Sequence, residues 1–212
     1  MKKILCSLFA ASMMLLGASA FAQVSVGAGY VNSKYSLKSS STSYTSDPAN
    51  GFYAGLEYSV PVGEVFGLSA GVNYEYLMSK NYNVGGISGD LKEQYINVPV
   101  RLNVGFHLGD DARVFIFGGP TFNYALAGQV DLGVKVGSFE VGGKYDMYKD
   151  GNYNRFDVMV GGGVGLDLME RFRVTAGYDF GMFNKLPKAS DGSEPSSKLT
   201  RNQLHAGIAF LF

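Results

Sequence analysis

Hydrophobic and polar side chains alternate at every second position over most of this chain. Between positions 68 and 78, the even positions hold Leu, Ala, Val, Tyr, Tyr and Met, whereas the odd positions are mostly small or polar. Successive side chains of a β-strand point to opposite faces, so this alternation predicts half-buried strands. The same pattern predicts strands at 52–60, 96–107, 155–168, 172–182 and 203–212.

Two further strands complete a predicted set of eight, at 24–35 and 114–126. The pattern of 114–126 does not show which of its faces is apolar. Each strand is long enough to cross a bilayer when tilted, which takes about 9–11 residues.

The connections between these strands alternate in length. Short turns are expected near 61–65, 109–113 and 169–171, and long polar connections near 36–50, 79–91, 127–153 and 184–198. Short turns on one rim and long loops on the other are typical of outer-membrane barrels. We therefore predict an all-β, transmembrane, antiparallel up-and-down barrel with both chain ends at the short-turn, periplasmic rim.

The third long connection has its own alternation, over 130–136 and 139–147. One interpretation is a hairpin that protrudes beyond the membrane. The alternative makes these segments two more membrane strands, which gives ten. Both segments are short and carry charges such as Asp131, Lys135 and Glu140. The length rule favours eight strands.

A soluble barrel also alternates, so a second feature has to decide which face meets lipid. The polar face is rich in glycine and poor in lysine, which suits a crowded interior better than a water-facing surface. Aromatic side chains on the apolar face gather near the strand ends, as in the aromatic girdles of membrane barrels. These are Tyr30, Tyr76, Tyr124 and Phe180 toward the long-loop rim, and Phe66, Phe106, Phe172, Phe210 and Phe212 toward the other.

The first residues have the form of a secretory signal. Lys2 and Lys3 precede an apolar stretch, and Ala20-Phe21-Ala22 is a small-x-small cleavage pattern. We predict a signal peptide over 1–22 and one barrel domain over 23–212. Cys6, the only cysteine, lies in the signal, so the barrel has neither disulfides nor cysteine metal sites. The balanced charge, with no basic patch, argues against a nucleic-acid partner.

The last residues resemble the C-terminal signal that the bacterial barrel-assembly machinery reads. That signal has a polar residue, a glycine two positions later, and aromatic residues at the last and third-last positions. His205, Gly207, Phe210 and Phe212 match it one by one. The resemblance implies this machinery as a partner during biogenesis.

The predicted mature chain as a whole, from Gln23 to Phe212, resembles the outer-membrane β-barrel domain family that is common in Bacteroidota and often labelled "porin family". The matching segments are Tyr95–Val100, Phe117–Pro120, Arg155–Asp157, Gly161–Gly165 and Ala176–Gly181. The resemblance implies an OmpA/OmpX-type barrel of eight strands in the lipid of a Gram-negative outer membrane. It implies no particular activity, because fold does not fix function.

Charged side chains of both signs fall on the inward face. An eight-stranded barrel is just wide enough for side chains to fill, so buried charges must pair. We expect a network that closes the lumen, with Asp167 opposite Arg173 across the short turn at 169–171. The inward set is Glu57, Glu75, Glu93, Arg101, Arg155, Asp157, Asp167, Arg173, Asp179 and Arg201.

No enzyme, cofactor or metal site is expected. The histidines are His107, near a periplasmic turn, and His205, near mid-barrel, and neither has an evident catalytic partner. The favoured hypothesis is a non-enzymatic barrel whose long extracellular loops act in surface interaction, in adhesion to an extracellular ligand or host surface, or in envelope integrity. The alternative is a small porin-like channel for ions or solutes, and a barrel enzyme is a weaker third.

Overall fold

A computed structural model describes residues 23–39, 43–84, 87–109, 111–136, 139–187 and 195–212. The predicted signal peptide lies outside these described residues. No helix in the described segments is long and apolar enough to cross a membrane. The strands are β1 (Gln23–Lys38), β2 (Ser43–Thr45), β3 (Ala49–Val62), β4 (Phe66–Val84), β5 (Ile87–His107), β6 (Ala112–Val136), β7 (Phe139–Asp146), β8 (Phe156–Leu168), β9 (Phe172–Gly181) and β10 (Lys198–Leu211).

Eight of these strands close into a ring. Their order is β10, β9, β8, β6, β5, β4, β3 and β1, and β1 pairs with β10 to complete it. β2 pairs with β1, and β7 pairs with β6. The predicted ring of eight strands is confirmed. The segments that suggested ten strands form the hairpin of β6 and β7 instead.

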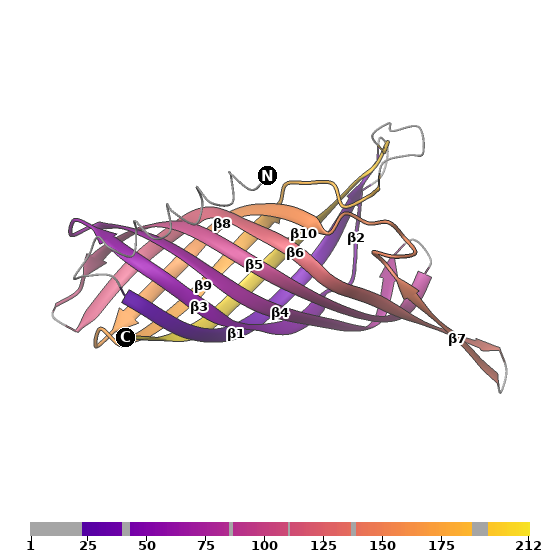
Figure 1. Cartoon of the computed structure of the whole chain (residues 1–212), viewed down its shortest axis with the longest axis horizontal. Helices are drawn as coiled ribbons and strands as arrows, with labels where there is room; N and C mark the ends of the chain where they lie inside the picture. Colours follow the sequence, from indigo (N-terminus) through magenta and orange to yellow (C-terminus); the bar gives the residue numbers. More distant parts are fainter. Residues whose placement is uncertain (1–22, 40–42, 85–86, 110, 137–138, 188–194) are drawn as a thin grey trace, which may run out of the picture.

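The two ends of the barrel differ (Figure 1). The C-terminus and the start of β1 lie together at the short-turn end, and the β6–β7 hairpin projects from the opposite, long-loop end. Strands β4, β5 and β6 extend past the ring toward this end. The loop predicted over 79–91 is therefore wrong in part, because most of it continues the β4–β5 ladder. Beyond a membrane, backbone groups can still pair with a neighbouring strand, so polar composition does not end a strand there.

Apolar side chains cover the outside of the ring. Tyr30, Tyr124 and Phe180 near the long-loop end and Phe66 and Phe106 near the short-turn end are all exposed. Their alternate neighbours point inward and include many buried polar groups. This inside-out distribution is that of a barrel in lipid, which confirms the predicted orientation.

The alternation in 114–126 does not show which face of β6 points into the lumen, but the burial of its side chains does. Phe115, Thr121 and Asn123 point inward and are buried, whereas Ile116 and Phe122 are exposed to lipid. Gln94 and Tyr95 of β5 pair with Ala127 and Ala125, so Leu126 is an extra residue that forms a bulge in β6. This bulge lies where the β6–β7 hairpin begins to leave the ring. Bulges of this kind bend a strand and increase its twist.

The seam that closes the ring is covered from inside by one aromatic ring. Tyr53 of β3 lies opposite Gly29 of β1, and Gly29 lies opposite Gly207 of β10. A Cβ at Gly29 would lie 2.5 Å from the Tyr53 ring, and one at Gly207 would lie 2.1 Å from the Tyr53 hydroxyl oxygen. The two glycines therefore provide the space in which Tyr53 packs across the seam.

Replacing Gly29 with valine should weaken this closure. The added side chain would displace Tyr53, and overpacking of this kind costs roughly 1–3 kcal/mol of folding free energy. The measurement is urea unfolding in detergent, followed by the heat-dependent shift in gel mobility. Ala28→Val, at the adjacent lipid-facing position, is the control and should change the midpoint little. Equal midpoints for the two variants would contradict the packing role of Tyr53.

Candidate functional site: the barrel lumen

The inward charges lie in three successive groups along the lumen. The first group is nearest the short-turn end and centres on Arg173 of β9. Its Nε donates to Asp167 Oδ1 at 2.7 Å and its Nη1 donates to Glu57 Oε1 at 2.9 Å. Arg113 adds a longer contact of 3.4 Å to Asp167. The structure thus has the ion pair expected across the short turn, extended by Glu57 from the far side of the ring.

The second group joins β5 to β9. Arg101 Nη2 lies 2.7 Å from Asp179 Oδ2 and donates to Thr121 Oγ1 at the same distance. Arg101 Nη1 also donates to the backbone carbonyl of Gly119. Pro120 follows Gly119 and has no N–H, so ladder pairing between β5 and β6 is interrupted at this point. The guanidinium of Arg101 supplies a donor where this ladder is interrupted.

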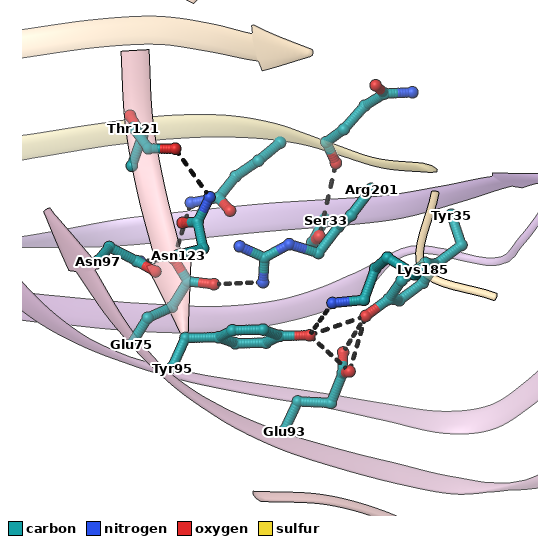
Figure 2. Close-up of polar contacts among 12 residues, drawn as sticks. Ser33, Tyr35, Glu75, Glu93, Tyr95, Asn97, Thr121, Asn123, Lys185 and Arg201 are labelled. Atoms are coloured by element: carbon teal, nitrogen blue, oxygen red, sulfur yellow. Dashed lines mark hydrogen bonds and ion pairs between the residues drawn. The ribbon is translucent and has the colours of Figure 1, made fainter. Parts of the chain in front are cut away.

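The third group is completely buried and joins β4 to β10 (Figure 2). Arg201 Nη1 donates to Glu75 Oε1 at 3.0 Å, and both side chains are 0% exposed. The other oxygen of Glu75 accepts from Asn97 at 2.7 Å and from Gln203 at 2.8 Å. The Arg201 guanidinium stacks on the Tyr95 ring, 3.9 Å from its centroid. Glu75 thus accepts three hydrogen bonds, which offset the cost of burying its charge. Among the described residues, Nε and Nη2 of Arg201 have no hydrogen-bond acceptor, so its charge is compensated by Glu75 and by the Tyr95 ring.

Above the third group, a cluster of aromatic and apolar side chains fills the long-loop mouth. Tyr35 and Tyr95 donate to Glu93 at 2.6 and 2.7 Å, and the hydroxyls of Tyr95 and Tyr148 lie 3.1 Å apart. We call this cluster the outer seal. Its buried hydrophobic members are Val31, Tyr35, Ala49, Leu77, Leu91, Tyr95, Ala125, Val130, Met147, Tyr148 and Leu199.

Two connections contribute to the outer seal. Tyr148 comes from the turn after β7, and its ring lies against Gly128, where a Cβ would be 2.5 Å away. Lys185 comes from the connection between β9 and β10 and is 0% exposed. Its ammonium donates to the Tyr95 hydroxyl at 3.4 Å and lies 5.1 Å from the centroid of that ring. Figure 2 shows the Lys185 side chain beside Tyr95, Tyr35 and Glu93.

Burial of Lys185 perturbs its ionisation. Removal from water, together with the positive charge of Arg201, lowers the pKa of Lys185 to about 8, although Glu93 opposes the shift. Burial also raises the pKa of Tyr148, helped by Glu93, so its hydroxyl stays protonated and can donate a hydrogen bond. The connection that carries Lys185 is fixed by backbone bonds from Asn154 N to Lys185 O and from Lys185 N to Leu199 O.

The remaining space in the lumen is unevenly distributed. A cavity of about 120 Å³ lies among the first two charge groups and is also lined by Phe117 and His205. It has room for several water molecules. A wider vestibule of about 740 Å³ opens at the short-turn end, where His107 and Glu170 line it. Arg173 borders both spaces.

Not every predicted lumen charge joins these groups. Arg155 lies at the rim, where its Nη1 donates to the carbonyl oxygens of Ala125 and Leu126 at 3.0 Å. Its guanidinium lies 4.8 Å from the centroid of the Tyr148 ring. Asp157 is buried, but no side chain in the described segments forms an ion pair with it. Its neighbour across the ladder is Asn123.

The four residues of the C-terminal motif separate by face. His205 points into the lumen, with Nε2 3.7 Å from Asp179 Oδ2, and Gly207 lies beneath Tyr53. Phe210 and Phe212 lie on the outward face near the short turns, with ring centroids 5.0 Å apart. The motif thus combines two lumen positions with two lipid-facing ones.

The outer seal was missed by the sequence reasoning, although a signal for it exists. Val31, Tyr35, Leu77, Leu91 and Tyr95 all occupy odd positions, which are inward in β1, β4 and β5. The inward face therefore changes from polar to apolar toward the long-loop end. Lys185 carries no such signal, because it lies in an irregular segment.

The model of the outer membrane protein β-barrel domain family matches residues 12–186. The chain belongs to this family. Membership places it in the outer membrane, so the short-turn end is periplasmic and the long-loop end is extracellular. No curated protein sequence matches the chain.

Solved structures of outer-membrane barrels resemble this member of the family. Ail, the attachment invasion locus protein of Yersinia pestis, solved with the heparin analogue sucrose octasulfate, is 14% identical, with a TM-score of 0.47 and coverage of 91% of this chain and 99% of that one. Neisserial surface protein A is 18% identical, with a TM-score of 0.47 and coverage of 89% and 97%. OprG from Pseudomonas aeruginosa is 11% identical, with a TM-score of 0.48 and coverage of 91% and 96%.

The pair of Arg101 and Asp179 gives a direct test of buried charge. Arg101→Leu leaves Asp179 without its cation, and breaking a buried pair on one side costs roughly 3–5 kcal/mol. Adding Asp179→Asn removes the isolated charge, so the double variant should regain much of the lost unfolding free energy. Urea unfolding of the wild type, both single variants and the double variant measures the coupling. Additive losses would mean that the two groups do not interact.

Lys185 should titrate well below an exposed lysine. The pKa of Lys185 is about 8 when its connection is docked and returns toward 10.5 when it is released. Between these values only the released form holds the proton, so docking should become more favourable as pH rises through that window. NMR titration of the Lys185 side-chain signal, assigned with Lys185→Met, measures the midpoint. A midpoint near 10.5 would show that the ammonium remains hydrated.

Proposed function

We propose that this protein is a non-enzymatic and non-conducting outer-membrane barrel that acts through its extracellular strands and connections. The observation that carries the proposal is the outer seal. Tyr95, Leu77 and Leu91 are 0% exposed, so the side chains that the structure describes pack closely together at the extracellular mouth and obstruct the entry of a solute. Below the seal, paired charges of both signs occupy the lumen, whereas ion-selective pores favour rings of one sign.

The extracellular part offers a surface for recognition. Strands β4, β5, β6 and β7 continue beyond the ring as a small sheet, and Gln129–Val136 pairs with Phe139–Asp146 at its edge. Recognition residues are often displayed on extensions of a rigid scaffold. This sheet and its neighbouring loops are suited to bind an extracellular ligand or host surface, or to contact other envelope components.

The histidines support a role without catalysis. His107 lines the periplasmic vestibule, and His205 lies inside the lumen beneath the outer seal. General acid–base chemistry needs a substrate within hydrogen-bond reach of the group. The seal prevents an extracellular substrate from reaching His205.

The C-terminal motif supports assembly by the barrel-assembly machinery. Phe210 and Phe212 face outward at the end of β10, the strand that closes the ring with β1. Phe212, the residue after β10, is exposed and its ring lies against that of Phe210, so this aromatic pair can contact an insertion partner before the seam closes. The chain would then remain in contact with outer-membrane lipid.

Planar-bilayer conductance of the refolded protein tests the closed lumen. The wild type, shown to be folded by heat-dependent gel mobility, should give no conductance steps. The triple variant Tyr95→Ala, Tyr148→Ala and Lys185→Ala removes the centre of the outer seal and should give small steps, because only the paired charges then obstruct the path. The control is Tyr74→Ala, which truncates a lipid-facing tyrosine on β4 and should remain silent.

One result would contradict the closed lumen, and a second would contradict the role of the outer seal. Conductance steps from the wild type that change with Arg101→Ala or Arg173→Ala would mean that the lumen charges line a water path. The protein would then be a small channel for ions or solutes. Silence of a folded triple variant would instead show that the charge groups alone close the lumen, and that the outer seal is not needed.

A further inference from the structure

Lysines gather on the outward face of the seam between β1 and β10, at its extracellular end. Lys34 and Lys38 of β1 and Lys198 of β10 occupy outward positions and are exposed. Lys38 lies directly opposite Lys198 in the ladder. Like charges at directly opposite positions destabilise a strand pair. Within the described segments, neither Lys38 nor Lys198 forms an ion pair with a carboxylate.

Beside Lys198, the outer surface has a shallow recess of about 640 Å³. Arg155 forms part of its wall, and the bonds from Nη1 to two backbone carbonyls hold this cation in place. No acidic side chain occurs among the described residues that line the recess. The lining consists of Tyr124, Asn154, Arg155, Phe156, Met182, Phe183, Asn184 and Lys198.

The recess lies where the lipid-facing surface changes character. Phe156, Phe180 and Leu204, on the strands that form it, are exposed to the hydrocarbon region. The cations lie beyond these side chains along the same strands. This level corresponds to the headgroups of the outer leaflet, where the nearest anions are lipid phosphates. The positive charge is local to this part of the extracellular rim, because Arg155 and Lys198 line the recess and Lys38 faces Lys198 across the ladder.

We propose that Lys38, Lys198 and Arg155 bind the phosphate groups of an outer-leaflet lipid, with its acyl chains lying against Phe156 and Phe183. A bound phosphate offsets the repulsion between Lys38 and Lys198. The fixed guanidinium of Arg155 provides, with Lys198, a second cation in the lining of the recess. The aromatic side chains then contact the part of the lipid that enters the hydrocarbon layer. This site is independent of whether the lumen conducts.

The test is retention of lipid A, a phosphorylated outer-leaflet lipid, by the full-length mature barrel, measured by native mass spectrometry from nanodiscs. Each lysine near an anionic surface contributes measurably, so Lys38→Glu with Lys198→Glu should lower retention by roughly tenfold or more. Lys80→Glu is the matched control, because Lys80 is an outward lysine at the extracellular end of β4 and does not line the recess. It should retain lipid A like the wild type.

A second measurement separates lipid binding from folding. Lys198→Glu alone places a carboxylate opposite Lys38, so the unfolding midpoint in lipid-free detergent should stay equal or rise while lipid A retention falls. A variant that is merely destabilised would show both a lower unfolding midpoint and lower retention of lipid A. Lipid A without its phosphates should be retained poorly by the wild type.

Three outcomes would overturn the proposal. The first is equal retention of lipid A by the wild type and the double variant. The second is equal retention of lipid A with and without phosphates. The third is displacement of lipid A by a soluble sulfated glycan, or by inorganic phosphate, when the soluble anion is present at a concentration far below that of lipid A. This last result would assign the cations to a soluble anion rather than to a lipid.

Discussion

The width of an eight-stranded ring is the constraint on which the rest of this structure depends. Such a ring encloses only enough space for side chains, so each inward residue must fit against those of the opposite wall. Gly29 and Gly207 make room for the Tyr53 ring at the seam, as a direct result of this limit. The same limit keeps bulk water away from most of the lumen and makes every inward charge dependent on a protein partner.

The charge partners come from strands that are not neighbours in the ring. Arg101 and Asp179 join β5 to β9, Glu75 and Arg201 join β4 to β10, and Arg173 and Glu57 join β9 to β3. A shift in register of β3, β4, β5, β9 or β10 would separate at least one of these pairs and leave a buried charge unpaired. The ion pairs therefore disfavour alternative registers of the strands. This role does not depend on whether the pairs add to the free energy of unfolding of the native barrel.

How far the sequence predicts these features depends on how local each one is. Strand number and lipid-facing positions follow from alternation within each strand. The pair of Asp167 and Arg173 is predictable because the two residues flank one short turn. Contacts across the lumen, such as that of Glu75 with Arg201, depend on the stagger between strands of the whole ring, which no single segment encodes. Arg155 was placed wrongly in the lumen because β8 begins one residue later.

The length of β6 has a geometric consequence. Its last contact with β8 is at Tyr124, yet the strand continues to Val136. At about 3.3 Å per residue, the part beyond the ring adds on the order of 40 Å of contour. A partner could therefore contact β6 and β7 well beyond the rim of the ring without touching the membrane-spanning part of the barrel.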